Sequence, residues 1–376
     1  MDLYGEKRNA VRTIVFLCAI MLLLTIVDLL PVEEWRREDS TDMSVLVPKP
    51  TKETIKDGTF MREYESFVEK EFVSKDNWQA LRMHMDVLRG VREINGVYLG
   101  KDDYLIEKHT EDSFSEENLQ RSMDAMQKLL EEFPQAKLMA VPTTDNILTD
   151  NLPAFAPYYD QRGLLEQIKS TLGEQAVIDV YDVMKAHAEE AVFYRTDREW
   201  TSLGAYYGYL EFAKSFYLPA KQYLKQEPVK VSEDFRGALY EQAGRAVDAE
   251  EIWMFPATAD KRYTITYDGT KTTDTFYEPE YLGGEDPLGY FLDGLHAVTE
   301  IERESFSQKK LFIIKDGFGE SMIPLLARHY KNVYVVDLSC YNDKLIDFMK
   351  ECDENGDMDV LVLYDCVTFA ESFRIP

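Results

Sequence analysis

Residues 311–336, LFIIKDGFGESMIPLLARHYKNVYVV, hold the pattern that decides the fold. An apolar run at 311–314 leads into a polar loop, and a helical pattern at 320–330 and a second apolar run at 333–336 follow. Continuously apolar runs on either side of a helix are typical of parallel strands that are buried on both faces. The stretch therefore predicts a strand–helix–strand unit of an α/β protein.

The same alternation continues in both directions along the chain. The further strands that we expect are 137–141, 176–180 and 360–363, and the further helices are about 115–133, 160–171, 182–190 and 344–349. Amphipathic helices between such strands predict a three-layer α/β domain with a parallel central sheet. Before this alternation, residues 97–99 and 104–106 predict a hairpin around a short polar turn.

A less regular stretch, about 217–305, interrupts the alternation. It contains a run of alternating polarity at 263–267, an Asp268-Gly269 turn and scattered Gly, Pro and aromatic residues. Such a pattern is closer to short antiparallel strands and loops than to a strand–helix unit. We interpret it as a β- and loop-rich insertion that builds a rim on the domain.

The N-terminus has the pattern of an export signal. An apolar run at 14–30 follows Lys7, Arg8 and Arg12, and no small-x-small pair precedes Pro31 to suggest cleavage. We therefore expect a cytoplasmic segment at 1–12, an uncleaved transmembrane signal anchor at 13–30 and a linker at 31–55. A helical spacing of aromatic residues follows at about 60–91. Residues 56–376 would then form one extracytoplasmic domain, tethered to the cell membrane by a single span.

Charge excludes several classes of partner. The 376 residues include 42 Lys and Arg against 69 Asp and Glu, a formal net charge of -27. A body this acidic repels phosphate backbones, so we expect no nucleic acid partner. The acidic residues Asp145, Asp197, Glu199 and Asp316 match no known cation-binding loop, and we expect no metal and no cofactor.

The candidate site lies in the loops that follow the expected strands. Ligands of open α/β sheets bind beyond the carboxyl ends of the strands, where this chain has the polar segments 142–145, 194–201 and 315–321. We expect Asp197, Glu199 and Asp316 to converge there. The other candidate cleft residues in these loops are Asp145, Trp200, Phe318 and Ser321.

Four segments carry a family resemblance: TDREWTSLGAYYGY at 196–209, IIKDGFGESMIPLLARHY at 313–330, NGVYLGKDDYLIE at 95–107 and VPTTDNILTDNLPAFAPYYDQ at 141–161. They resemble the DHHW-motif family of membrane-anchored Gram-positive proteins. That family is similar to the SGNH-like catalytic domains of alginate O-acetyltransferases. The resemblance implies an SGNH-hydrolase-like fold and chemistry on acetyl esters.

The resemblance also implies which positions once carried catalysis. In the wider family an Asp, a His two residues later and a Ser in a strand-to-helix turn act as a unit. Here Asp197 and Trp200 retain the Asp and Trp positions, whereas Arg198 and Glu199 occupy the two His positions and Gly317 occupies the Ser position. Glycine has no nucleophilic atom, so we expect a pseudoenzyme.

We therefore expect a catalytically degenerate accessory or binding component in O-acetylation of a cell-surface polysaccharide. The resemblance implies a membrane-bound O-acyltransferase as its partner. One alternative is an active O-acetyltransferase or esterase that uses Ser321 or another non-standard nucleophile. A second alternative is a structural envelope protein with a vestigial cleft. We expect His187, His296 and His329 to be structural rather than replacements for the missing base.

Overall fold

The chain divides into two compact units, Met1–Met85 and Asp86–Pro376. The computed structural model describes residues 12, 14–16, 19, 51–62, 64, 85, 89–220, 228–244, 247–255, 263–304, 307–353 and 356–376. The expected anchor at 13–30, linker at 31–55 and helical stretch at 60–91 therefore lie largely outside the described residues. None of the described helices has the length and apolar character that a membrane span needs.

The first unit contains the short helix α2 (Lys52–Lys56). Thr51 caps its N-terminus, because the Thr51 hydroxyl accepts a hydrogen bond from the Thr54 amide at 3.1 Å. Such a cap satisfies an amide group that has no partner within the helix.

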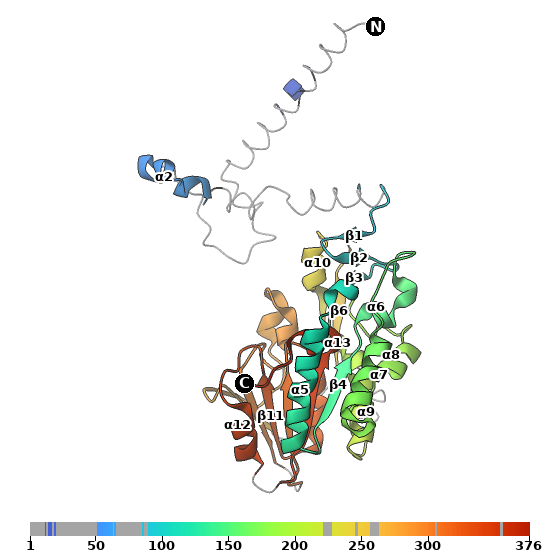
Figure 1. Ribbon diagram of the computed structural model, residues 1–376. Helices are drawn as coiled ribbons and strands as arrows, with labels where there is room; N and C mark the ends of the chain where they lie inside the picture. The colour runs from blue at the N-terminus through green and yellow to red at the C-terminus, as the bar shows by residue number, and fades with distance from the viewer. Residues whose placement is uncertain are drawn as a thin grey trace. The chain divides into compact units, whose positions relative to one another are not determined.

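A seven-stranded sheet forms the centre of the second unit (Figure 1). In spatial order its strands are β4 (Lys137–Val141), β12 (Asp359–Asp365), β10 (Lys310–Lys315), β11 (Asn332–Asp337), β9 (Val298–Arg303), β7 (Tyr263–Tyr267) and β8 (Lys271–Thr273). The first four are parallel to one another, and each of the last three pairs antiparallel with the strand before it in this order. The expected parallel sheet is thus right for four strands, but the sheet as a whole is mixed.

The interpretation of 217–305 as an insertion that builds a rim is wrong for its antiparallel strands β7, β8 and β9, which belong to the central sheet. Strand β9 alternates buried and exposed side chains, as a strand does when helices cover only one face of its sheet. This strand and β7 continue the central sheet. Among the described strands of this range, β5 (Val229–Phe235) and β6 (Glu250–Met254) form a separate two-stranded sheet.

The strand expected at 176–180 is also wrong. A short 3-10 helix, η3 (Glu174–Ala176), stands at its start, and a single parallel bridge joins Leu138 to Val177. The apolar residues of this segment are buried as expected, but they pack without a hydrogen-bonded ladder.

Alternate residues of β10 pack into two different cores. Leu311 and Ile313 pack into the core on one face of the sheet, which also includes Phe212 of helix α9 (Ser202–Ser215). Phe312 and Ile314 pack into the core on the other face. This is the expected three-layer arrangement. Figure 1 shows α5 and α12 against the sheet. The helices of the unit are α5 (Glu116–Glu132), α6 (Thr144–Ile147), α7 (Gln161–Leu172), α8 (Tyr181–Ala186), α9 (Ser202–Ser215), α10 (Ala238–Gln242), α11 (Ile323–Leu326), α12 (Leu345–Cys352) and α13 (Cys366–Ser372).

The expected hairpin is present and brings the N-terminal part of the unit to the loops of the sheet. Strands β1 (Glu93–Ile94), β2 (Val97–Leu99) and β3 (Leu105–Glu107) form an antiparallel sheet. Strand β3 lies beside α6 and α10 (Figure 1). The Leu105 amide donates to the Arg195 carbonyl at 2.8 Å, which ties the hairpin to the segment that carries Asp197 and Glu199.

Candidate functional site

A cavity of about 340 Å³ lies where the loop after β10 meets the segment before α9. Its wall brings together six of the residues singled out from the sequence, namely Asp197, Arg198, Glu199, Trp200, Gly317 and Ser321. The remaining residues of the wall are Tyr194, Ala238, Asp286, Leu288, Gly289, Phe291, Gly294, Leu295, Glu320 and Ser339. Segments that are more than 100 residues apart in the chain therefore share one hollow at the carboxyl end of the parallel strands.

Asp197 is held rigidly in a closed loop. An antiparallel bridge between Phe193 and Trp200 closes the loop, and one Asp197 oxygen, Oδ1, accepts from the Glu199 amide at 3.1 Å. The other oxygen, Oδ2, accepts from the Ala238 amide at 2.7 Å. Burial raises the pKa of Asp197 in spite of these hydrogen bonds.

The sequence pattern gave no signal for Gly237, which makes this arrangement possible. A Cβ atom at Gly237 would lie 2.3 Å from Asp197 Oδ2 and 2.4 Å from Asp197 Cβ. Only glycine allows the backbone to approach the carboxylate this closely.

Glu199 links the two halves of the cavity wall. Its Oε2 atom accepts a hydrogen bond from the Gly319 amide at 3.4 Å. Burial raises the pKa of Glu199 well above its ordinary value, and repulsion from Glu320, Asp197 and Asp316 raises it further. This carboxyl group therefore keeps its proton to a higher pH than an exposed glutamate does.

The turn after β10 places Gly317 in the cavity wall with room beside it. The Phe318 amide donates to Asp316 Oδ1 at 2.9 Å, which closes the turn. A Cβ atom at Gly317 would meet nothing within 4 Å. Gly319, in contrast, has a φ of 92°, and a Cβ atom there would lie 2.5 Å from the Leu363 side chain. A side chain can thus be added at the first glycine and not at the second.

Two expected cleft residues of this turn lie outside the cavity wall. Phe318 is 5% exposed and packs on Trp200, with 5.1 Å between the ring centroids. Asp316 closes the turn, and burial together with repulsion from Asp365 raises its pKa to about 8. Both residues therefore hold the turn and Trp200 in place without lining the cavity themselves.

Lys315 anchors the same turn from the end of β10. It is 4% exposed, and its Nζ donates to the Asp316 carbonyl at 2.6 Å, to Glu320 Oε1 at 2.5 Å and to Asp337 Oδ2 at 2.9 Å. Burial opposes its charge, but Glu320 and Asp337 outweigh this effect and raise the pKa of Lys315. A lysine directly after an apolar strand is visible in the sequence, but the sequence analysis did not single out Lys315 as part of the site.

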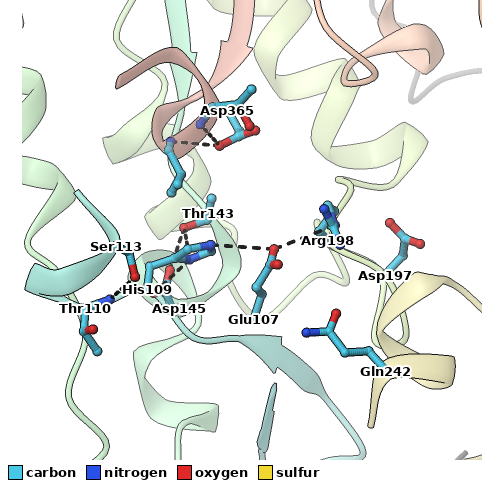
Figure 2. A network of polar contacts seen from close by, with 12 residues as sticks. Glu107, His109, Thr110, Ser113, Thr143, Asp145, Asp197, Arg198, Gln242 and Asp365 are labelled. Atoms are coloured by element: carbon cyan, nitrogen blue, oxygen red, sulfur yellow. Dashed lines mark hydrogen bonds and ion pairs between the residues drawn. The ribbon is translucent and has the colours of Figure 1, made fainter. Parts of the chain in front are cut away.

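Asp145 lies in a separate buried network instead of the cavity wall (Figure 2). It is fully buried, with Thr143 Oγ1 donating to its Oδ1 at 2.6 Å and His109 Nδ1 at 3.3 Å from its Oδ2. His109 Nε2 is 3.6 Å from Glu107 Oε2, which is 3.7 Å from Arg198 Nε. Burial opposes the charge of His109, but Asp145 and Glu107 outweigh it and raise its pKa to about 10. Charges of alternating sign thus lead from Asp145 to the cavity residue Arg198.

No histidine belongs to the described wall of the cavity. His187 lies 2.7 Å from Glu190 and stacks on Tyr207, His329 lies 2.8 Å from the Tyr209 hydroxyl, and His296 contacts two aspartates. Ser321 lies in η7 (Glu320–Met322) and lines the cavity, and the described contacts include no hydrogen bond from its hydroxyl to a base. The described residues also contain no group of three His, Cys, Asp or Glu that could hold a metal ion.

We expect Glu199→Gln to stabilise the protein at pH 8 by about 1 to 2 kcal/mol and to have little effect at pH 4. A carboxyl group with a raised pKa in the folded state favours folding below its unfolded pKa, and this contribution is lost as the pH rises through the folded pKa. Glutamine cannot lose a proton and still accepts from Gly319. Urea unfolding at both pH values checks this expectation, with the exposed Glu285→Gln as control. Equal shifts at pH 4 and pH 8 would contradict it.

Comparison with known proteins places this geometry in a family context. Residues 97–278 match the family model of the SGNH hydrolase-like domain of the acetyltransferase AlgX. A DHHW family protein from Eubacterium siraeum is similar in structure, with 19% identity, a TM-score of 0.61 and coverage of 74% of this chain and 93% of that chain. Bacillus cereus PatB1 has 20% identity, a TM-score of 0.60 and coverage of 73% and 98%. None of the curated proteins matches the chain.

At these identities the solved structures establish the fold alone, and the family model adds the type of domain. Together they confirm the resemblance drawn from the sequence motifs. Residues 97–278 of the chain are similar to the SGNH hydrolase-like domain of the acetyltransferase AlgX, and the chain is folded like a DHHW family protein.

Proposed function

We propose that this protein is a catalytically degenerate SGNH-like component of polysaccharide O-acetylation at the cell surface, which binds glycan instead of acylating it. The turn at Gly317 carries the proposal. It lines the cavity and has open space where a nucleophile would stand, while Asp197 and Trp200 keep their places in the same wall. The shape of an acyl-transfer site is kept and its reacting atom is missing.

The substitutions remove chemistry that the remaining groups do not replace. Glycine offers no hydroxyl, and at position 199 a carboxyl group stands where the family's base places an imidazole ring. Because nucleophile and base act as a unit, loss of both leaves only the effects of binding and of the backbone amides. Binding is therefore the activity that we assign to the cavity.

We place the protein at the cell membrane, with the apolar segment 14–30 as a single-pass anchor and the bulk of the chain outside the cytoplasm. The support for this is the sequence pattern of that segment behind three basic residues. A membrane-bound O-acyltransferase that delivers acetyl groups to a cell-surface polysaccharide is the partner that fits such a component.

An active enzyme is the second candidate, because Ser321 lines the same cavity as Glu199 and Glu320. Ser321 stands one helical turn beyond the Gly317 position in sequence. An attack from that place would therefore need a base other than the Asp-x-His arrangement.

A sulfonyl fluoride distinguishes the two candidates. PatB1 has been solved with a sulfonyl adduct, so this fold is open to such reagents. We expect the wild-type chain to show no adduct by intact mass and no hydrolysis of p-nitrophenyl acetate above that of the heat-denatured protein. Ser321→Ala should be indistinguishable from wild type. An adduct mapped to Ser321, or turnover that Ser321→Ala abolishes, would overturn the degenerate assignment in favour of the enzyme.

A further inference from the structure

Phe155 is an aromatic residue that projects into solvent from the loop after α6. Its side chain is fully exposed, although large apolar side chains are usually at least partly covered. Its φ of 64° lies in the left-handed region, which is uncommon for any residue with a bulky side chain. The loop therefore presents an aromatic ring outward at a cost in stability, and such a feature is typical of an interaction site.

The segment around Phe155 is uncharged, although the protein as a whole has a net charge of -27. Residues 153–158, which we call the apolar tip, are Pro-Ala-Phe-Ala-Pro-Tyr, and Tyr158 is 46% exposed. The exposed Asp150 and Asp160 stand on either side of the apolar tip. Because a charged group stays in water, the tip can enter an apolar medium only as far as these two aspartates allow.

The apolar tip is preformed. The Ala156 amide donates to the Pro153 carbonyl at 3.0 Å, which closes the tip into a turn. The Tyr98 hydroxyl donates to the Pro157 carbonyl at 2.7 Å, and Ala156 packs against the small core cluster that contains Tyr98. A segment that is already ordered loses little conformational freedom when it binds.

The apolar tip and the cavity lie at the same end of the central sheet. The tip follows β4 by way of α6, the turn of Gly317 follows β10, and β12 joins these two strands in parallel. The β2–β3 hairpin connects the two places, because the Lys101 amide donates to the Asn151 carbonyl and the Leu105 amide to the Arg195 carbonyl, both at 2.8 Å (Figure 1). A surface that takes up the tip would therefore face the cavity end of the domain.

The size of the apolar tip favours a lipid surface over a protein partner. A stable protein interface covers about 800 Å² on each side. The tip offers two aromatic side chains, and each of these can bury about 150 to 250 Å². Aromatic side chains do suit the interfacial region of a bilayer. A chain that is already tethered to the membrane needs only weak insertion, because the tether raises the local concentration of the lipid.

We propose that the apolar tip inserts into the interfacial region of the membrane that anchors the chain, with Phe155 among the lipids. This rests on the membrane anchoring proposed above and adds the orientation of the domain. A single span leaves the direction of the cavity undetermined. With the tip inserted, the cavity end of the domain stays at the membrane surface, within reach of a glycan that a membrane-bound partner modifies.

Photocrosslinking of the full chain in phosphatidylcholine liposomes tests the proposal. The photoreactive residue p-benzoylphenylalanine is incorporated at position 155, and intact mass after irradiation reports a lipid adduct. Tyr217 is the matched control position, because it is 94% exposed and has a φ of 54°. It follows Phe216, whose ring centroid lies 5.5 Å from Nζ of Lys137, at the opposite end of β4. We expect a lipid adduct at position 155 and none at position 217.

A pair of variants separates insertion from incidental contact with the bilayer. With the photoreactive residue at position 158, Phe155→Ser should lower the adduct yield at least about fivefold, since most of the apolar area of the tip is lost. Tyr217→Ser should leave the yield unchanged. Both replaced side chains are exposed, so both variants should melt like the wild type.

Co-flotation with the liposomes separates this proposal from the anchoring on which it rests. A chain that floats, but gives equal adduct yields at positions 155 and 217 or none at either, would overturn the insertion and leave the anchor intact. In cell membranes that contain the chain, an adduct from position 155 to a protein instead of a lipid would also overturn it, in favour of a protein partner. A chain that does not float would remove the anchor, and the insertion with it.

Discussion

The double variant Glu199→His/Gly317→Ser is expected to hydrolyse acetyl esters at least about 100-fold faster than the wild type, because general base catalysis alone contributes at that level. The scaffold keeps what such a site needs. Asp197 stands two residues before the restored base, and the serine side chain has open space at position 317. The Gly319 amide, which now donates to Glu199 Oε2 at 3.4 Å, becomes available to an oxyanion once the carboxyl group is removed.

The comparison of single and double variants decides whether the site acts as a unit. We expect Gly317→Ser and Glu199→His alone to stay within a few-fold of wild type, since a serine without a base and a base without a nucleophile both fail. p-Nitrophenyl acetate turnover measures the rates, and a sulfonyl adduct at position 317 identifies the nucleophile. A folded double variant with neither turnover nor adduct would contradict a preserved acyl-transfer geometry.

The parallel half of the sheet could be predicted because its strands are apolar throughout. The run at 311–314 became β10, and the run at 137–141 matches β4 at both ends. In β9, glutamates alternate with buried residues, so β9 is not a continuously apolar run and was not predicted as a strand of the central sheet. A strand covered on only one face carries a weaker signal, and its partner β7 lies 30 residues away in sequence across an irregular segment.

In the candidate site, too, contacts between residues close in sequence could be predicted, whereas contacts between distant segments could not. Asp197 and Glu199 stand on one short loop, so their proximity follows from spacing. Asp145 was expected in the cleft because it follows a strand of the sheet, but its oxygens are held by Thr143 and His109. His109 comes from a segment 36 residues earlier with no periodic pattern, and no spacing rule reports such a contact. Long-range polar contacts of this kind required the fold.

Lys315→Met is expected to destabilise the protein by about 3 to 5 kcal/mol, the cost of leaving buried charges without their partner. Methionine keeps most of the apolar volume of the lysine stem, so the loss reports the ammonium group. Without it, Glu320 and the fully buried Asp337 face each other without a cation, and the Asp316 carbonyl loses its donor. The melting temperature should fall by on the order of 10 °C, as this free energy implies for a domain of this size.

Lys309→Met is the matched control, because this neighbouring lysine is 54% exposed and its Nζ lies 4.0 Å from Asp359. Its effect should stay within about 0.5 kcal/mol, as for most surface ion pairs. The deficit of Lys315→Met should shrink at pH 4, because burial raises the pKa of Glu320 and its carboxyl group can then take up a proton. It should also be partly recovered in Lys315→Met/Asp337→Asn, which removes one of the two unpaired charges while its side-chain oxygen still accepts from the Ser339 amide. Equal effects of the two single lysine substitutions would mean that the turn carrying Gly317 is held by packing alone, and that the acidic wall of the cavity needs no internal cation to fold.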